Sequence, residues 1–193
     1  MCCGTKRLVE ISCPADCIYL TTAREHPAAV AVRRQQRDLT QFVEALRDFN
    51  ERQSRLFVAV NTAIVRSQPS DLHAIVDEDV IEASTALAAT FETASRGVIY
   101  EHRPATRTAE HLADAIRQML SEAGQRGGTA FERDAAVVLR RVEQTARAVH
   151  ADEPDNPRAY LGLLNRMVRT SQADSDKGRT ASDGANGPRL IVP

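Results

Sequence analysis

The sequence lacks tryptophan, has few aromatic residues and has no long apolar run, and each absence excludes a class of protein. Aromatic residues make up only 4% of the 193 residues, so a folded core has to be built from aliphatic side chains and alanine. No apolar run approaches the roughly 20 residues that a membrane-spanning helix needs. The first residues also lack the apolar stretch of a signal peptide. We therefore expect a cytoplasmic protein that does not span a membrane.

The chain also has no large excess of positive or of negative charge. The formal net charge is −1, so overall electrostatics provide no argument for binding nucleic acid or an anionic membrane. Residues 1–40 are slightly basic, which we interpret as an exposed helix face. The abundant alanine favours helices over sheets, because alanine has the highest helix propensity.

Several catalytic motifs are absent as well. No Glu-x-x-His pair occurs, which excludes the ferritin-like di-iron site of helical bundles. There is no P-loop, no Gly-x-Gly-x-x-Gly and no Gly-x-Ser-x-Gly. The apolar stripes described below are almost wholly aliphatic, so we expect no catalytic residues in the core.

What the chain does contain falls into three segments. Residues 1–26 hold all four cysteines, residues 27–170 show apolar periodicity, and residues 171–193 are mostly small and polar. We expect a cysteine-rich metal-binding arm, a helical bundle and a disordered tail, in that order.

The first helix is predicted from Pro27 to Gln68, a stretch without an internal proline or glycine. Its apolar residues alternate at spacings of three and four, which is typical of a helix buried along one narrow seam. Gln53 is the one polar residue in the seam, and we interpret it as fixing the register between helices. The full stripe consists of Leu39, Phe42, Leu46, Phe49, Gln53, Leu56 and Val60.

Three further long helices and a short one are expected. The second runs from about Asp71 to Tyr100 and the third from about Thr106 to Ala123, where glycines stop it. A capping box over residues 129–132 starts the fourth. Its buried side chains are expected to be Phe131, Ala135, Val138, Val142 and Val149. A short fifth helix begins at residues 156–157 and carries Tyr160, Leu161, Leu164 and Met167.

Short connections between these helices predict an all-α fold, an antiparallel up-down bundle of four long helices plus a short fifth. The first helix is much longer than the third. We therefore expect it to project beyond the bundle, or a second copy of the chain to complete the bundle. A protein partner or a homo-oligomer is the expected form of association.

The cysteine segment is the strongest chemical signal. Cys2, Cys3, Cys13 and Cys17 lie within sixteen residues, and the rest of the chain has no cysteine. Clustering favours a metal site or a redox pair over scattered structural thiols. Pro14 suits the first turn of a helix, which would place Cys13 at its N-terminus, where a thiolate is stabilised. The segment resembles half of a zinc knuckle or treble clef, and the sequence therefore predicts zinc bound by these four cysteines.

Alternatives to this ligand set stay open. Adjacent Cys2 and Cys3 strain a tetrahedral site, so one of them could be replaced by His26 or by a cysteine upstream of Met1. The same cysteines could hold an iron–sulfur cluster, although the Cys-x3-Cys spacing matches such clusters less well. Free thiols and a disulfide are the remaining interpretations, and the absence of an export signal disfavours the disulfide.

Two weaker features complete the list of candidate sites. Glu101 and His102, with Glu110 and His111, could form a polar site at one end of the bundle. The simpler interpretation is that these charges complement helix dipoles. The tail contains an apolar cluster, Pro188–Pro193, which could bind in a groove of this chain or of a neighbour.

The function predicted from these features is a non-enzymatic interaction or regulatory module in which a metal staples the arm to a helical bundle. The alternative is an iron–sulfur redox or sensor protein that uses the same cysteines.

Overall fold

The computed structural model describes residues 29–67, 74–124 and 128–169, and within these ranges it contains six helices and no strand. The predicted all-α class is thereby confirmed. The chain divides between residues 40 and 41 into two units. Of the first unit, residues 29–40 are described, and they are helical. In the described ranges, no helix combines the length and the apolar character required to cross a bilayer.

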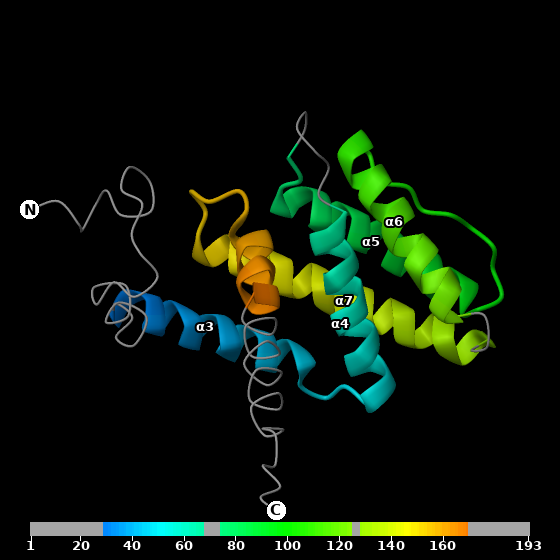
Figure 1. Ribbon diagram of the computed structural model, residues 1–193. Helices are drawn as coiled ribbons and strands as arrows, with labels where there is room; N and C mark the ends of the chain where they lie inside the picture. The colour runs from blue at the N-terminus through cyan, green and yellow to red at the C-terminus, as the bar shows by residue number, and fades with distance from the viewer. Residues whose placement is uncertain (1–28, 68–73, 125–127, 170–193) are drawn as a thin grey trace, which may run out of the picture. The chain divides into compact units, whose positions relative to one another are not determined.

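Figure 1 shows the helices in their order along the chain. They are α3 (Ala29–Leu46), α4 (Glu51–Arg66), α5 (Asp77–Ala94), α6 (Arg107–Gly124), α7 (Gly128–Asp152) and an unlabelled helix over residues 159–169. The predicted arm and tail, residues 1–26 and 171–193, lie outside the described residues.

The predicted helix from Pro27 to Gln68 is wrong, because the chain breaks between α3 and α4. Asp48 has a φ of 67°, in the left-handed region that a continuing helix does not allow. Asn50 then caps α4: its side chain accepts from the Gln53 backbone N–H at 2.9 Å, and the Gln53 side chain accepts from the Asn50 N–H at 3.1 Å. Gln53 therefore belongs to a capping box. Its Nε2 also donates to Asp134 Oδ1 of α7 at 2.8 Å, so it pairs with a neighbouring helix as the sequence indicates.

Replacing Asn50 by alanine tests whether the helix breaks here, because a cap and an uninterrupted helix predict opposite changes in the free energy of unfolding. At the N-cap of α4, the substitution removes an acceptor and should lower the free energy of unfolding by about 1 kcal/mol. In an uninterrupted helix it would instead raise stability, because alanine is the better helix former. Urea denaturation followed by circular dichroism measures the difference.

Ser54→Ala is the matched control for that substitution. Ser54 lies four residues later in the same helix, where alanine is favourable, so we expect little loss or a small gain in stability. A gain in stability in both variants would contradict the cap.

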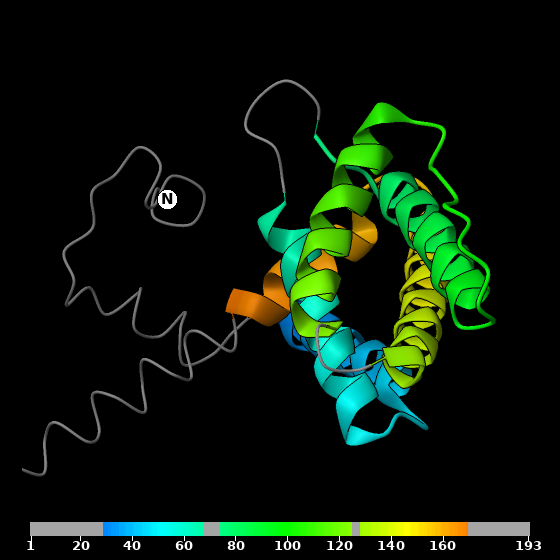
Figure 2. The same ribbon diagram turned by 90° about the vertical axis from the view of Figure 1, so that its right-hand side faces the viewer.

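The four helices α4 to α7 surround a common centre, as the view in Figure 2 shows. The helix α5 packs against α7 and α6, and α4 packs against the same two helices. The order around the centre is therefore α4, α7, α5, α6. The consecutive helices α4 and α5 lie diagonally opposite, which differs from the predicted arrangement, in which consecutive helices are neighbours.

The helix α5 is shorter than predicted, because its C-terminal end is set by Gly97. Gly97 has a φ of 81°, which suits a residue without Cβ. The Val98 N–H donates to the Thr93 carbonyl at 3.1 Å, and the Gly97 N–H donates to the Ala94 carbonyl at 2.8 Å. This pair of bonds is a Schellman motif, which ends the helix before the predicted Tyr100.

The connection over residues 95–106 runs back along α5 instead of turning directly into an antiparallel helix. The His102 N–H donates to Thr90 Oγ1 at 2.9 Å, and the Thr106 N–H donates to Glu82 Oε1 at 3.2 Å, closer to the start of α5. The helix α6 therefore begins beside the beginning of α5 and runs parallel to it. The prediction of an antiparallel pair is wrong because it assumed a short turn. Ile99, in this connection, is fully exposed.

The later helices agree with the prediction. The helix α6 starts and ends within one residue of the expected bounds. The five apolar side chains expected on the fourth helix are all buried on α7. Thr129 lies one residue inside α7 instead of ahead of it, and its side chain lies outside the described residues. In helix 159–169, the expected apolar residues are buried or half-buried.

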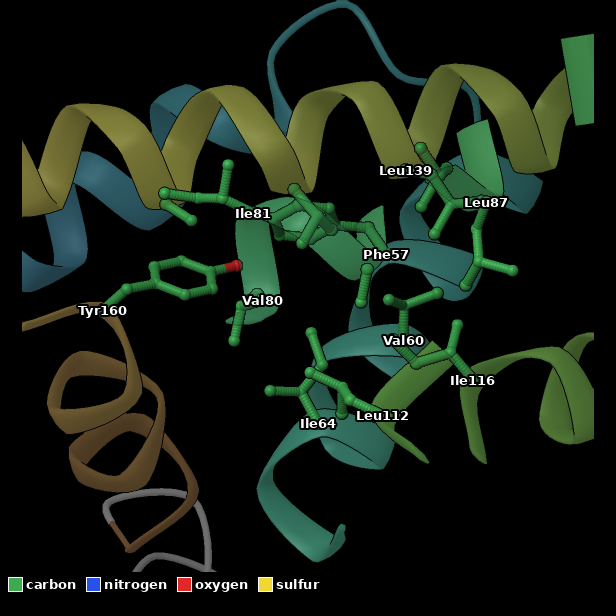
Figure 3. Packing of buried hydrophobic residues seen from close by; sticks show 14 of the residues in the cluster. Phe57, Val60, Ile64, Val80, Ile81, Leu87, Leu112, Ile116, Leu139 and Tyr160 are labelled. Atoms are coloured by element: carbon green, nitrogen blue, oxygen red, sulfur yellow. The ribbon is translucent and has the colours of Figure 1, made fainter. Parts of the chain in front are cut away.

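The core is aliphatic and rich in alanine, as the composition predicts. Figure 3 shows part of it, where Phe57 of α4 lies among side chains of the surrounding helices and Tyr160 points inward from helix 159–169. The largest side chains with almost no exposed surface are Tyr160, Phe57, Ile64, Leu87, Leu112, Ile116, Leu120, Leu139, Leu161, Leu163, Val60 and Val80.

Candidate functional site

The predicted metal ligands cannot be placed. Cys2, Cys3, Cys13, Cys17 and the alternative ligand His26 all lie outside the described residues. Among the residues that are described, no three histidine, cysteine, aspartate or glutamate side chains lie close enough together to hold a metal ion. The cysteine site therefore stays a prediction.

The two acid–histidine pairs do not form a joint site. Glu101 forms an ion pair with Arg117 of α6 at 3.0 Å, and His111 is exposed. Glu110 lies in the first turn of α6, where its charge complements the helix dipole. Within the described part of the chain, no hydrogen bond or ion pair links Glu110 or His111 to Glu101 or His102. The helix-dipole interpretation therefore holds for Glu110 and is wrong for Glu101 and His102, which lie in the connection well beyond the end of α5 at Ala94.

A polar cleft of about 370 Å³ lies between α5 and the connection that runs back along it, and His102 is among its lining residues. His102 Nε2 is buried and has no hydrogen-bond partner, while the His102 ring packs edge-on against Tyr100. Glu82 also lines the cleft, but its carboxylate accepts from Thr106 Oγ1 at 2.9 Å and from the N–H groups of Ala105 and Thr106. This carboxylate therefore caps the start of α6.

A second cleft, of about 500 Å³, lies between the end of α5 and the outer face of α7. Arg140 lines it and holds Glu92 with two bonds, at 2.7 and 2.9 Å, together with Glu143 at 3.0 Å. The bond to Arg140 lowers the pKa of Glu92. Arg141 donates to backbone carbonyls at the end of α3 and lies over the Phe49 ring at 4.9 Å. Both arginines are therefore engaged in holding helices together.

A third opening is an apolar groove of about 240 Å³, which we call the α4 groove. It lies between α4 and helix 159–169, next to the last turns of α3. Its lining residues are Phe42, Val58, Asn61, Thr62, Val65, Leu164, Met167 and Val168. Val58 is 49% exposed at this surface, whereas Phe42, Val65 and Met167 are half-buried against the core.

The two polar side chains of the α4 groove are already bonded within the protein. Asn61 Nδ2 donates to the Phe57 carbonyl at 2.9 Å, and Asn61 Oδ1 accepts from the Tyr160 hydroxyl at 2.5 Å. Thr62 Oγ1 donates to the Val58 carbonyl at 2.8 Å. Because these two side chains are bonded within the protein, the groove can bind an occupant mainly through apolar contacts. Burial, with the negative charge of Asp77, raises the pKa of Tyr160, so its hydroxyl stays protonated and remains the donor to Asn61.

The position of helix 159–169 depends on one buried carboxylate. Asp77 is fully buried at the start of α5 and accepts the backbone N–H groups of Tyr160 at 2.9 Å and Leu161 at 3.1 Å. It thus satisfies N–H groups in the first turn of helix 159–169 that have no partner within that helix. Burial raises the pKa of Asp77, and the bonds from Tyr160 and Leu161 oppose that effect. His150 Nδ1 lies 3.7 Å from Asp77 Oδ2.

Sequence reasoning missed the α4 groove and the buried bonds beneath it. Met167 and Leu164 were placed correctly on the apolar face of the last helix, and Phe42 on the seam of the first. Asn61 and Asp77 were not singled out, because each pairs with a residue more than 80 positions away. The local sequence carries no signal for such pairing.

Comparison of the chain with protein-family models, with curated proteins and with solved structures finds no match, so its function has to be argued from its own residues and geometry.

Proposed function

We propose that this protein is a non-enzymatic interaction module, and that it binds a short apolar segment of a partner protein in the α4 groove. The observation that supports this most directly is the chemistry of the groove. Its walls are aliphatic, with Phe42 at one side, and its polar groups Asn61 and Thr62 are engaged within the protein. Such a surface gains free energy from apolar burial and offers no free polar side chain for chemistry.

The charged side chains Glu82, Glu92 and Arg140 of the two clefts described above support the same proposal. Glu82 in one cleft and Arg140 with Glu92 in the other are bonded to groups that hold the fold. A general acid or base has to reach a substrate proton, and a carboxylate that caps a helix is poorly available for that role. Their arrangement favours a structural role over a catalytic one.

The cysteine arm belongs to the proposal as a separate element. We propose that zinc is bound by Cys2, Cys3, Cys13 and Cys17, with thiolates as the ligands that zinc prefers. Zinc would staple the arm without redox chemistry. An iron–sulfur cluster on the same cysteines is the alternative, and it would make the arm a redox sensor.

The first test asks whether the α4 groove binds apolar segments. The probe is an acetylated, amidated hexapeptide with a central leucine-isoleucine-valine triplet, and a peptide with a serine triplet is its control. With 13C-labelled methionine methyl groups, Met167 reports on the groove, and Met119, which lies on α6 and does not line the groove, is the reference. We expect the apolar peptide to shift the Met167 signal and leave Met119 unchanged.

Two valine variants make that test specific. Val58 in the groove is 49% exposed, and Val137 on the outer face of α7 is 46% exposed. Changing either one to glutamate should leave the fold intact, because both side chains already face solvent. We expect Val58→Glu to abolish the Met167 shift and Val137→Glu to preserve it. Equal binding by both variants would contradict the proposal.

Metal content tests the arm. Cys13→Ser should release the metal yet leave the helical circular dichroism and its melting transition in place, because the core residues lie between Ala45 and Leu164, outside the arm. Elemental analysis of protein purified without oxygen identifies the metal, and absorbance near 400 nm would favour the iron–sulfur alternative. Global unfolding of the variant would contradict the stapling role.

A further inference from the structure

The α4 groove suits a small number of aliphatic side chains. Its volume of about 240 Å³ is below the range of roughly 300–1,000 Å³ typical of pockets for drug-sized ligands. Met167 forms part of its wall, and an unbranched thioether adapts to differently shaped neighbours. A run of two or three branched aliphatic residues is the occupant that this lining fits.

This chain carries such a run beyond its last described helix. Residues 170–187 contain no apolar side chain larger than alanine. Pro188 and Arg189 follow, and then come three consecutive residues, Leu190, Ile191 and Val192, which are the first large aliphatic residues after Val168. Residues 170–193 lie outside the described residues.

The length of the intervening segment suits a return to the groove. Helix 159–169 itself supplies Leu164, Met167 and Val168 to the groove, so the chain leaves this helix close to the site. Twenty residues, 170–189, separate this helix from Leu190, and an unstructured chain of that length has a root-mean-square span of about 25 Å. This span is ample for a return to an adjacent groove, and short tethers of this kind give effective concentrations in the millimolar range. Even weak contacts would then keep the groove occupied.

We infer that Leu190, Ile191 and Val192 of this chain bind in its own α4 groove and compete there with the partner segment. The inference rests on the proposed function, since it names one apolar segment that the groove takes. The consequence is self-inhibition: an external segment has to displace the chain's own residues before it binds.

The test compares two triple variants of the full chain. In the first, Leu190, Ile191 and Val192 are all changed to serine. In the second, the control, three alanines of residues 170–187 are changed to serine instead; they are Ala173, Ala181 and Ala185. We expect the first variant to move the Met167 methyl signal with Met119 unchanged. We also expect it to bind the apolar hexapeptide about ten-fold more tightly than the wild type, because a competitor at millimolar effective concentration is gone.

The outcomes separate this inference from the proposed function. If both triple variants and the wild type bind the hexapeptide with equal affinity, the groove binds apolar segments and the self-inhibition is wrong. If none of them binds it, the proposed function fails as well. A Met167 signal of the wild type that changes on dilution from about 500 to 10 μM would show that the segment comes from a second copy, which overturns binding within one chain.

Discussion

Phe57→Ala is expected to lower the free energy of unfolding by about 3–5 kcal/mol, the range for removing a large aromatic ring from a core. Phe57 has no exposed surface, and its ring packs against Phe42 at a centroid distance of 5.6 Å and Phe49 at 5.8 Å. These partners come from α3 and from the break before α4. The loss therefore affects the packing of three consecutive parts of the chain.

The composition makes this loss hard to compensate. Only 4% of the residues are aromatic, and many core positions are alanine, which has no further rotamers with which to fill a cavity. The cost of a cavity rises with the volume that stays empty. Domains of this size are stable by about 5–15 kcal/mol, so we expect a large fall in the denaturation midpoint.

The neighbouring residue provides the control for Phe57. Val58 lies next to it on α4 and is 49% exposed, so Val58→Ala should change the free energy of unfolding by about 0.5 kcal/mol or less. Urea denaturation at neutral pH measures both variants. A loss of less than 1 kcal/mol for Phe57→Ala would mean that the ring does not lie in the core.

Asp77→Ala is expected to lower the free energy of unfolding by about 2–4 kcal/mol, because it leaves two buried backbone donors without an acceptor. These donors are the N–H groups of Tyr160 and Leu161. The same carboxylate fixes the start of helix 159–169, which forms one wall of the α4 groove. We therefore expect the variant to lose hexapeptide binding at temperatures where α4 to α7 are still folded.

Glu78→Ala is the control for Asp77. Glu78 is the next residue in the first turn of α5 and is exposed, so its removal costs only a dipole interaction of about 0.3–1 kcal/mol. Hydrogen exchange of helix 159–169 separates the two effects: faster exchange is expected in Asp77→Ala and unchanged exchange in Glu78→Ala. Unchanged exchange in both would contradict the anchoring role.

The pH dependence of stability gives a second signature of Asp77. Burial raises the pKa of this carboxyl in the folded state, so the folded protein binds its proton more tightly than the unfolded chain does. The stability that Asp77 contributes through this proton is fully present below the ordinary pKa of aspartate. It is lost as pH rises through the raised pKa that Asp77 has in the folded protein. Relative to Asp77→Asn, which has no carboxyl to titrate, the wild type should become less stable over that window.

The sequence predicted helices best where glycine or proline bounds them. Gly124 and Pro104 flank α6, and its bounds agree with the prediction to within one residue. The break before α4 was missed, although its signal is present: Asn50 and Gln53 have the spacing of a capping box. The apolar stripe continues across the break with the same spacing of three and four residues, and it led to the prediction of one continuous helix in spite of this capping-box spacing. Periodicity reports which residues are buried and does not show whether the helix between them is continuous.

The candidate site was largely beyond prediction for a different reason. Tyr160 and Asn61 meet only because helix 159–169 packs beside α4, and Asp77 reaches that helix from the start of α5. Such pairs depend on the order of the helices around the centre. The sequence does not show that α4 packs against α7 and α6 and lies opposite α5. The direction of α6 was mispredicted for a related reason, because the return of residues 95–106 along α5 is set by side-chain bonds of Thr90 and Glu82.

The return of the chain along α5 also indicates where this protein tolerates a change of length. Ile99 is fully exposed, and the backbone around it is held from both sides, through the bonds of Val98 to Thr93 and of His102 to Thr90. Exposed positions with such anchors are the usual sites of accepted insertions and of circular permutation. New termini or an inserted domain at Ile99 would leave all six described helices intact, which makes this position the natural place to attach a reporter.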